Sequence, residues 1–155
     1  KDLNGFSEDE FINKISNKFI VETASCDGAY HPEKKHTFGM YLNKKWYKLT
    51  AKNGTFDESN PVDQLDVSIL QKNLLTPVLN IGDPRTDKRI DFIGGIRGLG
   101  ELERLVDGGM AVAFSMHPTT LEDLMSIADA GMIMPPKSTW FEPKLLSGLF
   151  IHKLK

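Results

Sequence analysis

The stretch Met110-Ala-Val-Ala-Phe-Ser-Met116 is almost entirely apolar and predicts a buried β-strand in the C-terminal half of the chain. Gly108-Gly109, directly before it, is a typical stop for a helix whose apolar positions begin at Leu99. After the strand, Thr119 or Thr120 is placed to cap a second helix. The strand therefore lies between two predicted helices.

Two further strands are predicted on either side of this unit, at residues 89–93 and 148–152. The C-terminal half then has the order strand, helix, strand, helix, strand. Such an order is typical of right-handed crossovers with at least partly parallel pairing. We expect the carboxyl ends of the strands at 89–93 and 110–116 to open onto the same edge of the sheet.

The N-terminal half reads as a helix, a strand and a hairpin. Ser7 and Glu10 have the spacing of a capping box, and residues 20–23 follow as a short strand. A β-hairpin is predicted for residues 37–42 and 45–50, with its turn at Asn43-Lys44. Another helix is predicted for residues 61–75. The expected fold is a single α+β (mixed α/β) domain over residues 1–155, with helices packed on a mixed sheet.

Composition limits the classes of function. The 155 residues are 40% hydrophobic and 26% charged with a net charge of −2, which fits one globular domain and gives no general attraction for nucleic acid. Cys26 is the only cysteine, which excludes an internal disulfide and favours the cytoplasm. No apolar run reaches the roughly 18 residues of a membrane helix. Because the chain begins at Lys1 without a methionine, we expect it to be a segment of a longer protein.

A glycine loop after the strand at 89–93 is the first candidate site. Gly94, Gly95 and Arg97 would present backbone N–H groups and a guanidinium to an anion, and His117 would end the next strand on the same edge. The loop matches neither the dinucleotide fingerprint nor the P-loop. The alternative is an ordinary strand-to-helix turn with a solvent-facing arginine and a structural histidine.

The loop at 135–143 is the second candidate site. Lys137, Ser138 and Thr139 could contact an anion, while Trp140 with Glu142 would form a stacking surface or lid. The alternative is a proline-stiffened loop whose aromatic side chains cover the edge of the core. No catalytic triad and no metal site can be assembled from the sequence, so catalytic residues and cofactors stay unassigned.

A family resemblance rests on three segments and a hairpin. The segments are Leu65-Asp-Val-Ser-Ile-Leu70, then Asp83-Pro-Arg-Thr-Asp-Lys-Arg-Ile-Asp-Phe92 with Gly94-Gly-Ile-Arg-Gly98, and Pro135-Pro-Lys-Ser-Thr-Trp-Phe-Glu-Pro-Lys144 with Ser147-Gly-Leu-Phe150. The hairpin contributes His36-Thr-Phe-Gly-Met-Tyr41 and Trp46-Tyr47. Together they resemble the C-terminal part of the domain-of-unknown-function family 1015, over nearly the whole chain. Members of that family are longer bacterial and archaeal proteins, often labelled as partition proteins of the ParA/ParB/RepB type.

The resemblance implies that a phosphate-binding motif of the Asp-Gly-His-His-Arg type, shared with ParB-like folds, lies in the N-terminal part of such proteins; this chain lacks it. The preferred reading is a binding or structural module of a larger phosphate- or nucleotide-handling protein. Its partners would be the N-terminal part of its own parent chain and a phosphate-bearing small molecule. The alternative is part of a kinase or nucleotide-dependent transferase site that uses Asp91, Arg97, His117 and Lys137. DNA binding is the weakest reading because the net charge opposes it.

Overall fold

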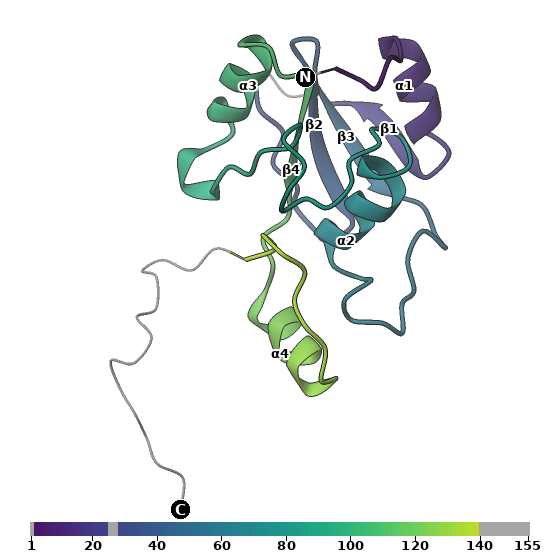
Figure 1. Ribbon diagram of the computed structural model, residues 1–155, viewed down its shortest axis with the longest axis vertical. Coiled ribbons are helices and arrows are strands. Elements are labelled where there is room, and N and C mark those ends of the chain that lie inside the picture. Colours follow the sequence, from purple (N-terminus) through teal and green to yellow (C-terminus); the bar gives the residue numbers. More distant parts are fainter. Residues whose placement is uncertain (1, 25–27, 140–155) are drawn as a thin grey trace, which may run out of the picture.

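The structure is a computed structural model that describes residues 2–24 and 28–139 (Figure 1). At its centre is a four-stranded antiparallel sheet with the strand order β1-β3-β2-β4. The strands are β1 (Phe19–Thr23), β2 (Thr37–Leu42), β3 (Lys45–Ala51) and β4 (Val112–Met116). The helices are α1 (Glu8–Ile15), α2 (Asp66–Leu70), the π-helix η1 (Gln71–Leu75), the 3-10 turn η2 (Gly95–Arg97), α3 (Gly100–Asp107) and α4 (Leu121–Asp129).

The α+β class is confirmed, and so are the first helix, the strand after it and the hairpin. Ser7 and Glu10 form the predicted capping box at the start of α1. Asn43 and Lys44, both with positive φ, close the hairpin between β2 and β3. Within the described ranges, no helix is both long enough and apolar enough to cross a membrane.

Both faces of β2 are covered, and β2 is therefore buried along its whole length. Phe38 and its neighbours on the same face of the sheet join the core formed with α1, α2 and η1, where Phe38 meets the Phe19 ring edge-on at 5.7 Å. The opposite face meets α3. There the Trp46 indole donates to a Glu103 carboxylate oxygen at 2.7 Å, and the Tyr41 hydroxyl donates to Asp107 at 3.3 Å.

The prediction of parallel pairing was wrong for the described strands. β4 lies antiparallel beside β2, with Phe38 opposite Met116, and residues 89–93 form no strand. Local ion pairs explain this difference. The Arg89 guanidinium binds Asp87 and also donates to the carbonyls of Leu79 and Asn80. These bonds hold Arg89 against the chain that follows η1, where it does not pair with a strand.

Two other predicted elements also differ. The helix predicted for 61–75 becomes regular only at Asp66, because Leu65 has an extended backbone (ψ 135°) that interrupts the helical turns after Asn60. Asn60 does cap those turns by accepting from the amide of Val62 at 3.0 Å. The strand predicted at 148–152 lies outside the described residues.

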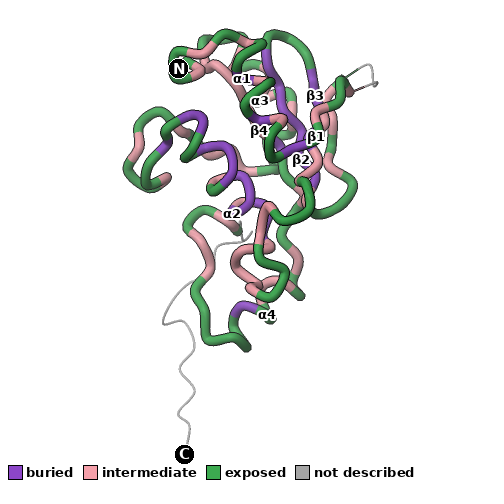
Figure 2. The backbone as a smooth tube through the Cα atoms, turned by 90° about the vertical axis from the view of Figure 1, so that its right-hand side faces the viewer, coloured by how far each residue is buried: buried purple, intermediate pink, exposed green. Residues whose placement is uncertain are grey.

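α4 lies at the opposite end of β4 from α3 (Figures 1 and 2). Its N-terminus is capped by Thr120, one of the two predicted caps, and Thr120 forms a capping box with Asp123. Buried residues concentrate in the strands and along α2 and η1, whereas α4 is largely exposed and buries only Ile127 (Figure 2). The ion pair between Lys35 Nζ and Asp123 Oδ1, 2.5 Å apart, ties the first turn of α4 to the segment before β2.

Replacing Lys35 with methionine is expected to loosen α4 while leaving the rest of the fold intact. A partly exposed ion pair contributes about 0.2–1 kcal/mol, so the free energy of unfolding should fall by less than about 1 kcal/mol. Because α4 has few other contacts, amide exchange across residues 121–129 should accelerate several-fold relative to the sheet. Lys34→Met, which changes the adjacent exposed lysine, is the control. Equal exchange rates in the two variants would contradict the role of this ion pair.

Candidate functional site

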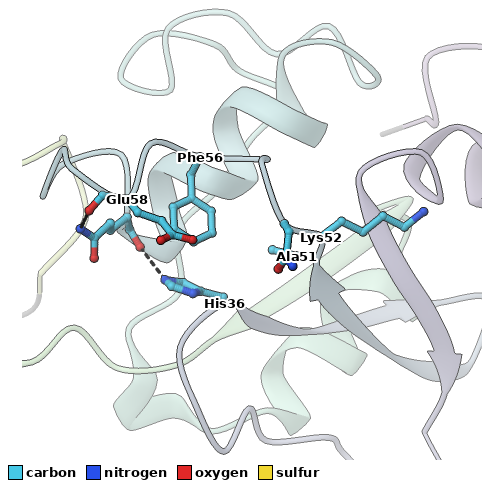
Figure 3. A pocket seen from close by; sticks show the side chains of 7 residues that line it. His36, Ala51, Lys52, Phe56 and Glu58 are labelled. Atoms are coloured by element: carbon cyan, nitrogen blue, oxygen red, sulfur yellow. Dashed lines mark hydrogen bonds between the residues drawn. The ribbon is translucent and has the colours of Figure 1, made fainter.

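An open cavity of about 390 Å³, which we call the hollow, lies between the start of β2 and the chain that follows β3 (Figure 3). Pockets of this size accommodate small organic ligands. Its walls combine an aromatic side chain with amide, carboxylate and imidazole groups. The lining residues are His36, Ala51, Lys52, Asn53, Phe56, Glu58 and Gln64.

His36 is fixed from several directions at the base of the hollow. Its backbone adopts a positive φ of 64°, and its amide donates to Asp66 Oδ1 at 2.8 Å. Its ring packs against the Phe56 ring, with the centroids 4.3 Å apart. Nε2 lies 3.2 Å from the Gln64 carbonyl oxygen, which can only accept. Nε2 therefore carries a proton, and in the neutral imidazole Nδ1 is an acceptor.

The polar side chains of the hollow differ in how strongly they are held. The Gln64 amide donates to the Glu58 carbonyl oxygen at 2.5 Å, which ties the two ends of the loop together. Lys52 donates to the Ser16 carbonyl oxygen at 2.6 Å, and its side chain extends away from Phe56 (Figure 3). The Glu58 side chain lies beside Phe56 in the same view. The hollow thus offers a ring surface next to a carboxylate.

A second, much smaller cavity of about 10 Å³, which we call the Asp66 cavity, shares Gln64 with the hollow. It is lined by Lys35, Gln64, Leu65, Asp66, His117, Pro118 and Asp123. Asp66 Oδ2 and His117 Nδ1 are both buried, and neither has a hydrogen-bond partner among the described residues. Burial raises the pKa of Asp66, while the amide of His36 and the imidazoles of His36 and His117 act in the opposite direction.

The structure does not bring the glycine loop and His117 together. Gly94 and Gly95 enter the η2 turn, and Arg97, whose side chain is 65% exposed, lies 3.8 Å from Glu101 Oε1 of α3. His117 follows β4 at the other end of that strand and lines the Asp66 cavity together with Asp123 of α4. The shared sheet edge expected for them required a strand at 89–93 parallel to β4, but residues 89–93 form no strand and β4 pairs antiparallel with β2. Anion binding by either group stays a prediction.

Part of the second predicted site does lie near His117. The Thr119 hydroxyl donates to the Ser138 carbonyl oxygen at 2.9 Å, and the Ser138 hydroxyl donates to Pro135 at 2.6 Å. Lys137 takes a positive φ of 61° in this turn, and both Lys137 and Thr139 are exposed. The chain at 137–139 thus folds back beside the residues that follow His117. Trp140 and Glu142 lie outside the described residues.

Sequence reasoning identified His117 but missed the other residues that form the two cavities. It placed His36 only in the hairpin motif and gave Phe56 and Gln64 no role. One signal was available at Asp66, an acidic residue inside the apolar run Leu65–Leu70. A carboxylate on the buried face of a helix is uncommon unless it is paired or functional.

The fold and its cavities define the class of this protein: a single-sheet α+β domain with a small polar hollow beside a buried carboxylate and imidazole. Residues 1–68 match the sequence model of the family described as "Protein of unknown function (DUF1015)". The matched stretch covers 68 of the 155 residues and contains His36, Phe56 and Asp66. No curated protein and no solved structure matches the chain. The function of the chain is uncharacterised.

Proposed function

We propose that this chain is a binding module and that its hollow takes a small ligand with a planar heterocyclic ring, of the nucleobase class. The observation that carries the proposal is the packing of the Phe56 ring against His36 in the wall of a cavity of about 390 Å³. The module binds and does not catalyse by itself. We expect it to work in the cytoplasm, as the single cysteine predicted.

The chemistry of the walls favours a ring with polar edges. Every nucleobase presents a π-face, and stacking on an aromatic side chain is worth about 1–3 kcal/mol per base. The edges of the ring would face the Glu58 carboxylate and the Asn53 and Gln64 amides, which line the hollow. Lys52 is held by Ser16, so the described residues that line the hollow offer no free lysine or arginine for a phosphate. A nucleoside therefore fits this cavity better than an inorganic anion.

A thermal-shift screen with the four common nucleosides and with pyrophosphate tests the proposal. At least one nucleoside should raise the melting temperature of the chain, because a ligand that binds only the folded state stabilises it. Phe56→Leu keeps an apolar group but removes the ring, and the nucleoside shift should largely disappear. Phe92→Leu is the matched control, since Phe92 is also half-buried but does not line the hollow. An equal shift in both variants would refute stacking on Phe56.

A second candidate function is phosphate or nucleotide handling within a larger protein, with the N-terminal part of the parent chain as partner. The hydrogen bond from Thr119 to Ser138 favours it, because it holds the 137–139 turn next to His117. In the same screen, stabilisation by pyrophosphate that is lost in His117→Gln would support this candidate. Stabilisation by nucleosides alone would support the first.

A further inference from the structure

The Asp66 cavity contains a polar site that is separate from the proposed ligand hollow. Asp66 is only 9% exposed, and its Oδ1 accepts from the His36 amide at 2.8 Å. Its Oδ2 has no hydrogen-bond partner among the described residues. An acceptor buried in this way costs about 1–3 kcal/mol unless a donor reaches it. The carboxylate thus has one satisfied oxygen and one that requires a donor.

The other polar groups around the cavity are already occupied. Asp123 on α4 accepts from Lys35, and it also accepts from the amide and hydroxyl of Thr120 at 3.0 Å each. The Gln64 side-chain amide donates to the Glu58 carbonyl oxygen, and the Gln64 backbone carbonyl faces His36 Nε2. His117, at the end of β4, is the exception, because its buried Nδ1 has no partner in the described part of the chain. Two unpartnered atoms therefore remain, one carboxylate oxygen and one imidazole nitrogen.

We propose that Asp66 and His117 jointly bind one hydroxyl group, supplied by a water molecule or by a small alcohol, whose oxygen bridges Asp66 Oδ2 and His117 Nδ1. The hydroxyl donates its proton to the carboxylate and accepts the proton of the Nδ1–H tautomer. One group thereby satisfies both buried atoms.

The size and composition of the cavity support a hydroxyl over other ligands. About 10 Å³ is the space that one water-sized group occupies. The described ranges contain no cluster of three or more histidine, cysteine or acidic side chains suited to a metal ion. A hydroxyl combines a donor and an acceptor on one atom, which is what an acceptor oxygen and an imidazole nitrogen need together.

Nuclear magnetic resonance on the whole chain tests this site. In wild-type protein, the His117 ring protons should show a cross-relaxation peak to a water molecule with a long residence time. The peak should be absent in Asp66→Leu, which removes both carboxylate oxygens at similar volume. It should persist in Asp63→Leu, because the Asp63 carboxylate pairs with Lys72 outside the cavity.

A titration of the wild-type protein with methanol distinguishes the two sources of the hydroxyl. Loss of the water peak together with a saturable shift of the His117 resonances would support the site and show that it accepts an alcohol. A peak unaffected by methanol would support the site as a water site. Absence of both the water peak and a methanol response in wild-type protein would overturn the proposal. This result does not depend on whether Asp66→Leu folds, nor on whether the hollow binds nucleosides.

Discussion

Replacing Gly39 with alanine is expected to lower the free energy of unfolding by about 2–3 kcal/mol, within the usual range for over-packing a close-packed site. An added Cβ would lie 2.3 Å from Ser115 Oγ, 2.8 Å from the Tyr30 carbonyl oxygen and 3.0 Å from the Trp46 ring. The Ser115 hydroxyl could rotate away, but it would then lose its hydrogen bond to Tyr30 at 3.1 Å. The Tyr30 oxygen belongs to the backbone and cannot move without shifting its segment.

The effect of Gly39→Ala is measured by urea unfolding against Gly82→Ala. Gly82 has no atom within 4 Å of an added Cβ, so alanine there should change the stability by less than about 0.5 kcal/mol. Equal stabilities of the two variants would show that the segment at Tyr30 is not packed on β2. A large loss only in Gly39→Ala would show that this segment covers the sheet opposite the main core.

The elements with local signals were predictable from the sequence. Ser7 and Glu10 lie three residues apart, and their hydrogen bonds depend only on that spacing. The same holds for the hairpin at Asn43-Lys44 and for the Thr120 cap of α4, where the structure selects Thr120 over Thr119. Each of these interactions forms between residues close together in the chain, so a short window of sequence contains all of its participants.

The sheet topology was not predictable in the same way. The apolar run at 110–116 specifies a buried strand but not its neighbour, and the run pairs with β2, more than 70 residues earlier in the chain. Residues 89–93 have the composition of a strand, yet Arg89 is held by Asp87 and by two carbonyls. The ion pair lowers the pKa of Asp87 well below its usual range. These side-chain hydrogen bonds compete with backbone pairing in a sheet, and the pattern of apolar residues in the sequence does not reveal them.

The two cavities also depend on contacts between residues far apart in the chain. His36 and Asp66 are 30 residues apart, and His117 reaches the same cavity from the far end of β4. A histidine before a strand and an aspartate in a helix each have an ordinary structural explanation when read singly. Only the fold shows that Asp66 accepts from the His36 amide, lines one cavity with His117, and has one carboxylate oxygen without a partner among the described residues. The site is therefore a product of tertiary structure.

Replacing Asp66 with asparagine is expected to stabilise the protein by about 1 kcal/mol at pH 7. Asparagine keeps an oxygen that can accept from the His36 amide, but it removes a buried negative charge. Burial is the main cause of the raised pKa of Asp66 and outweighs the favourable effects of His36 and His117. A carboxylate retained at the expense of stability indicates a role in function.

The stability gained by Asp66→Asn should increase as the pH rises. Because folding raises the pKa of Asp66 above its unfolded value of about 3.9, the folded state binds this proton more tightly. The wild-type protein should therefore lose stability as the pH rises from about 4 through the folded pKa, while Asp66→Asn lacks this loss. The difference between the two proteins should be small near pH 3, where Asp66 is protonated in both states, and should reach a plateau above the folded pKa.

Urea unfolding of both proteins across this pH range measures the difference, and titrations of other groups cancel when the two curves are subtracted. Asp63→Asn is the matched control. Its carboxylate pairs with Lys72 Nζ at 2.6 Å near the surface, so its removal should give no gain in stability. If Asp66→Asn instead destabilised the protein by more than about 1 kcal/mol at pH 7, the charge of Asp66 would stabilise the fold. A gain that appears only above pH 4 would show that the charge of Asp66 is held in the cavity at a cost to the stability of the fold.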